Sequence, residues 1–204
     1  MNNYIINIMN KYGYLGILFL ITVENIFPPI PSEVILTLGG FMTNQPKCNM
    51  NILLVILYST LGSLLGAIIL YCIGYLLNVD RIKIIVNSKL GKILHLKMDD
   101  IEKSNNKFNN NGSITVLYSR FIPIIRSLIS IPAGINKMNF FLFLIYTFIG
   151  SIIWNTVLVG LGALVGENYM LVANIFSKYS KIILFLIILL IIYKIIKWLK
   201  NMIK

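Results

Sequence analysis

The stretch ENIFPPIPSE, residues 24–33, decides how this chain folds, because it places three prolines inside an apolar segment. Pro28, Pro29 and Pro31 remove three backbone N–H donors and stop helix propagation. The flanking apolar half-helices have roughly ten residues each, and neither alone can cross a hydrocarbon core of about 30 Å. We therefore predict that residues 14–42 form a re-entrant hairpin, whose irregular tip is buried in protein or faces water.

A second broken segment, SITVLYSRFIPIIRSLISIPAGINK, occupies residues 113–137. Pro123 and Pro132 interrupt it, and Gly134 follows. The same argument predicts a second re-entrant hairpin, in which these three residues shape the tip as the earlier prolines shape the first.

The composition places both segments in a membrane. Of the 204 residues, 57% are hydrophobic and 12% are charged, whereas a soluble domain has about a quarter of its residues charged. The net charge of +11 could suggest nucleic acid. However, the basic residues gather in residues 81–107 and 194–204, beside hydrophobic runs and without a series of stacking aromatics, which argues against that partner. The composition predicts an all-α integral membrane protein with a single domain.

Three further runs are apolar and long enough to cross the membrane: 51–77, 139–165 and 181–200. Glycines in the first two predict close contact with other helices. They are Gly62, Gly66 and Gly74 in the first run, and Gly150, Gly160, Gly162 and Gly166 in the second.

Residues 1–13 predict a short amphipathic helix at the membrane interface. Tyr4, Ile5, Ile8 and Met9 fall on one helical face, and asparagines and a lysine fall elsewhere. The side of the membrane on which this helix lies is left open.

The lysines predict the topology. Residues 78–112 are polar and basic, and four lysines follow one another closely near the C-terminus. Because basic residues stay with the anionic cytoplasmic leaflet, we expect residues 78–112 and the C-terminus in the cytoplasm. Two crossings separate these regions only if residues 113–137 are re-entrant.

The order of the segments repeats. A broken hairpin followed by a glycine-rich spanning helix occurs at 14–77 and again at 113–166. One crossing lies between the two hairpins, so the first is expected to open outward and the second inward. The predicted fold is an inverted repeat of re-entrant hairpin plus transmembrane helix, followed by a C-terminal transmembrane helix. Such repeats are typical of transporters with a site between discontinuous helices.

Four charged residues flank the two breaks: Glu24 and Glu33 the first, Arg120 and Arg126 the second. A charge at mid-bilayer costs roughly 2.5–3.5 kcal/mol. The economical arrangement brings the two tips together, with carboxylates facing guanidiniums in a watery cavity at the midplane. Two other readings stay open: the acids lie at the interface, or the arginines extend to the lipid headgroups.

The sequence shows no Ser/His/Asp arrangement, no His/Cys cluster with metal-ligand spacing and no phosphate-binding glycine loop. We therefore expect no enzyme activity, no metal and no cofactor. The arginines could still bind phosphate, because a guanidinium presents a planar fork of donors. Trp154 is read as a core residue, and the glycines as packing residues.

At these residues the chain resembles the DedA family of membrane proteins, whose domain is also called the SNARE-associated or VTT domain. The resemblance covers about residues 12–167. Its matching stretches are ENIFPPIPSE at 24–33, GSLLGAIILYCIG at 62–74, SRFIPIIRSLISIPAGINKM at 119–138 and GSIIWNTVLVGLGALVG at 150–166.

The resemblance implies a small lipid transporter with two opposed re-entrant loops, in a bacterial-type plasma membrane. Family members move undecaprenyl phosphate, or phospholipids such as phosphatidylethanolamine, between leaflets, and some depend on the proton gradient. The family's acidic pair falls on Glu24 and Glu33, and its arginine pair on Arg120 and Arg126. Two features depart from the family pattern: Pro-Ser precedes the second acid, and no arginine follows Gly74.

The leading hypothesis is therefore a flippase for undecaprenyl phosphate or a related anionic lipid, coupled to protons or Na⁺. Three alternatives stay open. The first is a flippase or scramblase of phosphatidylethanolamine, and the second is a proton or small-cation antiporter. The third is a scaffold whose basic loop recruits partners. The sequence also leaves a homo-oligomeric assembly open.

Overall fold

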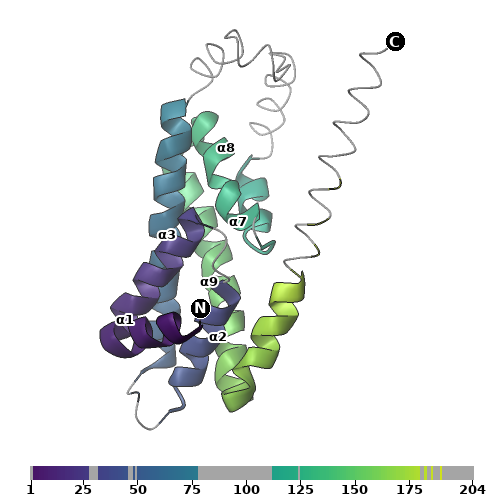
Figure 1. Cartoon of the computed structure of the whole chain (residues 1–204). Helices are drawn as coiled ribbons and strands as arrows, with labels where there is room; N and C mark the ends of the chain where they lie inside the picture. The colour runs from purple at the N-terminus through teal and green to yellow at the C-terminus, as the bar shows by residue number, and fades with distance from the viewer. Residues whose placement is uncertain are drawn as a thin grey trace.

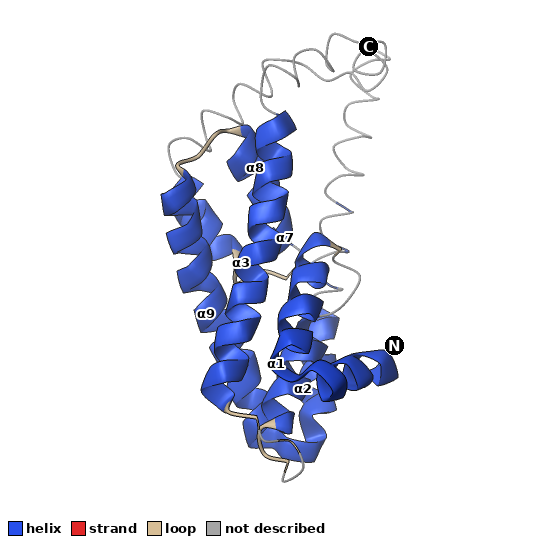
Figure 2. Ribbon diagram, turned by 90° about the vertical axis from the view of Figure 1, so that its left-hand side faces the viewer, coloured by secondary structure: helices blue, strands red, loops and turns tan. Residues whose placement is uncertain are grey.

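The computed structural model describes residues 2–27, 32–45, 48, 50–77, 112–123, 125–179, 182, 185 and 189. This part of the chain contains helices, turns and short loops, and no strand (Figures 1 and 2). The predicted tip residues Pro28, Pro29 and Pro31 lie outside the described residues. So do nearly all of the basic region 78–112 and most of the predicted span 181–200.

The first helix, α1 (Asn2–Ile26), bends sharply at Gly13. Gly13 has φ 56° and ψ −128°, a conformation that glycine adopts without steric cost. In Figure 1 the N-terminal part lies across the bundle, and the part after Gly13 runs along it. The limb from 14 to 26 is about 20 Å long at the helical rise of 1.5 Å per residue, which is shorter than a hydrocarbon core.

The N-terminal part of α1 buries part of its apolar face in the protein. Ile5 and Met9 are buried, and Ile8 is half-buried, but Tyr4 is 76% exposed. An exposed Tyr4 can contact the membrane interface, so the amphipathic interfacial helix stays a prediction. A phenol ring carries a polar hydroxyl and is favoured at a wet boundary rather than inside a core.

The first half of the chain continues with α2 (Ser32–Met42) and α3 (Ile52–Leu77). The end of α2 and the start of α3 lie at the same end of the molecule (Figure 2). Asn51 starts α3, because its side-chain oxygen accepts a hydrogen bond of 2.8 Å from the backbone N–H of Leu53.

The second half begins with a helical stretch at 112–119, followed by α7 (Ile125–Leu128), α8 (Ser130–Ile135) and α9 (Phe140–Val165). Pro123 lies in the turn before α7, as expected for a break. Pro132, in contrast, lies inside the first turn of α8, where a missing N–H is tolerated. Because Pro132 has no backbone N–H, it cannot donate a hydrogen bond to the carbonyl of Leu128, the residue at which α7 ends. The break between α7 and α8 therefore falls at Ile129.

After α9 the chain turns through the short 3₁₀ helix η1 (Gly166–Asn168), and residues 169–179 are again helical. Gly166 has φ 60°, which explains why α9 stops there. Among the described residues, a side-chain carbon at Gly160 or Gly166 would meet nothing within 4 Å. Within this part of the chain, these two glycines are therefore not the packing residues that the sequence suggested.

The two halves pack reciprocally, starting with α2 against α9. A side-chain carbon at Gly40 would collide with the backbone carbonyl of Val159, and one at Gly162 would collide with the carbonyl of Thr37. Both glycines therefore allow the two helix backbones to touch, which is how helices associate closely in lipid.

The mirror contact joins α8 to α3. Here a carbon at Gly134 would collide with the carbonyl of Tyr71, and one at Gly74 with the carbonyl of Ile131. Since α3 and α9 begin at opposite ends of the molecule, the two halves run in opposite directions (Figures 1 and 2). Each short helix thus packs on the long helix of the other half, as an inverted repeat requires.

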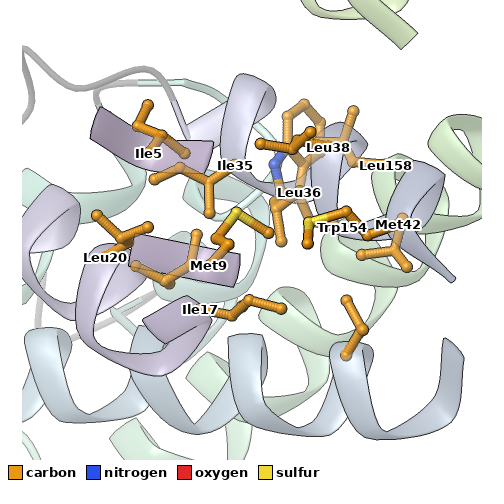
Figure 3. Packing of buried hydrophobic residues seen from close by; sticks show 13 residues of the cluster. Ile5, Met9, Ile17, Leu20, Ile35, Leu36, Leu38, Met42, Trp154 and Leu158 are labelled. Carbon is orange, nitrogen blue, oxygen red and sulfur yellow. The ribbon is translucent and has the colours of Figure 1, made fainter. Parts of the chain in front are cut away.

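The larger apolar core lies between α1, α2 and α9, and Figure 3 shows its members. Met9, Ile17, Leu36 and Leu158 are among its fully buried side chains. A second cluster joins residues of α3, α8, α9 and the 112–119 helix.

Among the described residues, three helical stretches are apolar and long enough to cross a membrane: Tyr4–Ile26, Ile52–Leu77 and Phe140–Tyr179. The bend at Gly13 divides the first stretch, and η1 divides the last. Along α3 the small residues are buried, whereas one outward row exposes a large aliphatic side chain every four residues: Leu53, Leu57, Leu61, Leu65, Ile69 and Ile73. This row suits contact with lipid. The molecule is a multi-pass, all-α membrane protein.

Candidate functional site

The four predicted charged residues all lie inside the bundle. Glu24 is close to the end of α1, Glu33 is the second residue of α2, Arg120 follows the 112–119 helix and Arg126 is the second residue of α7. Their exposed fractions are 6%, 4%, 2% and 5%, in that order. The arginines therefore do not extend to a surface, and the acids do not lie on one.

Glu24 and Arg126 form an ion pair across the two broken segments. Arg126 Nη2 donates to Glu24 Oε2 at 2.7 Å, and the side chains are 6% and 7% exposed. A buried charge is costly unless it is paired and hydrogen-bonded, so this contact is expected to hold the two segments together.

Arg120 is held by neutral groups. Its Nη2 donates to Ser130 Oγ and to Thr147 Oγ1, each at 3.1 Å. The guanidinium also lies over the ring of Phe143, with Cζ 5.9 Å from the ring centroid. Gly150 makes this burial possible, because a side-chain carbon there would lie 2.6 Å from Arg120 Cβ.

Glu33 lies in the first turn of α2, where the positive end of the helix dipole favours a carboxylate. The Thr37 hydroxyl donates to the backbone carbonyl of Glu33 at 2.6 Å. Glu24 is paired with Arg126, and Arg120 and Arg126 line one small space, so these three charged side chains lie together.

Uncharged polar residues extend the site, and the sequence reading did not assign them. Ser127 Oγ donates to Asn25 Oδ1 at 3.4 Å, and Asn155 Nδ2 donates to Thr60 Oγ1 at 3.1 Å. These four side chains are buried to 1% exposure or less. Asn155 could have been identified from the sequence, because it is an amide side chain inside a 26-residue hydrophobic helix.

A small closed space adjoins the ion pair. It is too narrow for a water molecule. Its lining consists of Asn25, Ser63, Arg120, Arg126, Ser151 and Trp154. The expected watery cavity is therefore closed here: the guanidiniums face protein groups rather than an aqueous chamber.

The described residues hold no group of three or more His, Cys, Asp or Glu side chains that could bind a metal ion. What the site offers is two arginines, two carboxyls and a set of hydroxyls and amides in a dry interior. Such a site suits the binding of an anion in competition with an internal carboxylate.

Comparison with known proteins gives consistent matches. The family model of the VTT domain matches residues 30–164. The chain is 51% identical over 183 residues to an alkaline phosphatase-like protein of Lactococcus lactis subsp. cremoris, covering 90% of this chain and 85% of that one. No solved structure matches.

Two similar relatives carry the name undecaprenyl phosphate transporter A. The protein of Staphylococcus aureus is 35% identical over 198 residues, covering 97% of this chain and 96% of the relative. The protein of Bacillus subtilis is 33% identical over 190 residues, covering 93% and 90%.

Proposed function

We propose a function from one premise: the chain belongs to the VTT domain family of membrane proteins. We propose that it is a transporter, namely a flippase that moves an anionic lipid between leaflets. The proposed lipid is undecaprenyl phosphate, the substrate printed in the names of two relatives. Both opposed hairpins are proposed to be re-entrant, with residues 78–112 and the C-terminus cytoplasmic.

The buried pair between Glu24 and Arg126 carries this proposal. It joins the two broken segments at 2.7 Å, and Arg126 is the group that a lipid phosphate would compete for. An arginine bound to a carboxylate can exchange it for a phosphate with little change in geometry, because both anions match the guanidinium fork. Binding would therefore loosen the contact between the segments, which is what exposure of the site to a leaflet requires.

Charge balance supports coupling to protons. When all four residues are ionised, the group of Glu24, Glu33, Arg120 and Arg126 is neutral. When both carboxyls take a proton, the charge of the two arginines remains, and it matches a phosphomonoester of about −1.5 to −2 near neutral pH. Proton uptake by the two acids as the lipid binds would keep the site near neutrality.

The test is leaflet-resolved transport of undecaprenyl phosphate in reconstituted vesicles, with and without a proton gradient. We expect Arg126→Ala to abolish transport and Arg126→Lys to reduce it, because lysine lacks the planar fork. Arg81→Ala is the matched control, since it removes an arginine of the basic region and should leave transport intact. Transport by Arg126→Ala at the normal rate would refute the proposal.

The same vesicles separate the alternatives. Movement of phosphatidylethanolamine, but not of undecaprenyl phosphate, would favour the phospholipid flippase or scramblase. Proton or Na⁺ flux without any lipid would favour the antiporter. Loss of function in Arg81→Ala together with further lysine replacements in 83–107 would favour the scaffold. Release of inorganic phosphate from the lipid would reveal hydrolysis, which the proposed transport does not include.

A further inference from the structure

Two buried hydrogen-bond donors beside the ion pair have no partner among the described residues: Arg120 Nε and Trp154 Nε1. Arg120 and Trp154 are 2% and 9% exposed, and both side chains line the closed space beside Arg126. Leaving one buried donor unpaired costs about 1–3 kcal/mol. Two such donors at one space point to a group that they bind in another step of the cycle.

Both donors are held in place. Arg120 is fixed through Nη2 by Ser130 and Thr147, and its Nε is left for a ligand. The Trp154 ring stacks edge-on against Phe176, with centroids 5.7 Å apart and planes at 88°. Figure 3 shows the indole packed among core side chains of α2 and α9. Donors fixed in this way lose little freedom when they bind.

The chemistry of the pair selects an oxyanion. An indole N–H and a guanidinium N–H can donate but cannot accept, so they complement a group that only accepts. A phosphate offers several such oxygens, whereas an ammonium group offers none. The indole also adds a donor without adding a charge, which a buried site can hold at lower cost while empty.

We propose that Trp154 is a phosphate-binding residue of this protein, whose indole N–H donates to one oxygen of the lipid phosphate while Arg120 Nε donates to another. This inference rests on the proposed function, because it assigns a further residue to the same headgroup. The closed space admits the phosphate when Arg126 leaves Glu24. Trp154 therefore contributes to recognition as well as to the core.

The chain has two tryptophans, Trp154 and Trp198, so Trp198→Phe makes Trp154 the single tryptophan. This variant, reconstituted in phosphatidylcholine vesicles, is titrated with a polyprenyl phosphate while tryptophan emission is recorded. We expect a saturable change with the lipid phosphate and none with the uncharged polyprenol. A change with inorganic phosphate alone would overturn the assignment to a lipid headgroup, and no change with any ligand would overturn the binding role of Trp154.

Trp154→Phe keeps an aromatic ring and removes only the N–H. We expect the lipid concentration for half-maximal transport to rise about tenfold or more, as for loss of a hydrogen bond to a charged group, with a smaller effect on the maximal rate. Phe176→Leu is the packing control, because it alters the neighbour of the indole and keeps the donor. If both variants raised the half-maximal lipid concentration equally, Trp154 would act only as a packing residue.

The failure of this inference is distinguishable from failure of the proposed function. Normal transport and normal half-maximal concentration in Trp154→Phe, with Arg126→Ala inactive, would refute the role of Trp154 and leave the flippase intact. Absence of lipid transport by the wild-type chain would refute the proposed function and this inference with it.

Discussion

At the level of single residues, the two buried arginines depend on different kinds of partner. Arg120 relies on two hydroxyls and on the missing side chain of Gly150, whereas Arg126 relies on the carboxylate of Glu24. The two arginines therefore differ in what a ligand must displace. A phosphate at Arg126 replaces another anion, while a phosphate at Arg120 would use the Nε that Ser130 and Thr147 leave available.

The Glu24–Arg126 pair can be tested with a double-mutant cycle. We expect Glu24→Gln and Arg126→Met each to lower the free energy of unfolding by about 3–5 kcal/mol, because each leaves one buried charge without its partner. The double variant should lose clearly less than the sum. Unfolding in mixed micelles measures all four proteins, and strict additivity would contradict a direct contact.

Two glycines of α9 provide a matched pair. Gly150→Ala should lower the free energy of unfolding by about 1–3 kcal/mol and impair transport, because the new methyl group meets Arg120 Cβ and Cγ. A methyl group at Gly160 meets none of the described residues within 4 Å, so Gly160→Ala should be neutral or stabilising by up to about 1 kcal/mol, since alanine favours a helix. Thermal unfolding in detergent distinguishes them, and equal losses would contradict the packing described here.

At the level of helices, the bend in α1 divides the helix into a part that packs against the core and a part that carries a site residue. The part before Gly13 presents Ile5 and Met9 to the core and lies across the bundle, while the part after it delivers Glu24 to the site. A straight helix could not do both, because the two parts would share one axis. The conformation of Gly13 is therefore the condition for this arrangement.

We expect Gly13→Ala to cost of the order of 1–3 kcal/mol, because an L-residue at φ 56° and ψ −128° is strained. Asn10→Ala, at an exposed position of the same helix, is the control and should change little. The midpoint of thermal unfolding measures both variants. A Gly13→Ala protein as stable as the control would mean that the bend is not required.

At the level of the whole molecule, the sequence predicted the features that are costly in lipid. Charges and prolines inside apolar runs must be compensated, so the four charged residues and the breaks could be found without a structure. The partners of Arg120 could not, because serine and threonine are tolerated in many places in apolar helices and their contacts depend on how helices cross. Trp154 was assigned to the core for the same reason: its ring packs there, and its unpaired N–H appears only in three dimensions.

The reciprocal packing makes a prediction about topology. Single cysteines at positions 12 and 45, on either side of the first hairpin, and at 104 and 137, on either side of the second, are placed in a variant whose two native cysteines are replaced by serine. If both hairpins are re-entrant, Tyr12→Cys and Gln45→Cys react with an impermeant maleimide from outside the cell. Ser104→Cys and Lys137→Cys then react only after permeabilisation, because α3 crosses once between the pairs. Labelling of positions 12 and 45 from opposite sides would show that residues 14–42 cross the membrane, and the inverted repeat would then not be built from re-entrant hairpins.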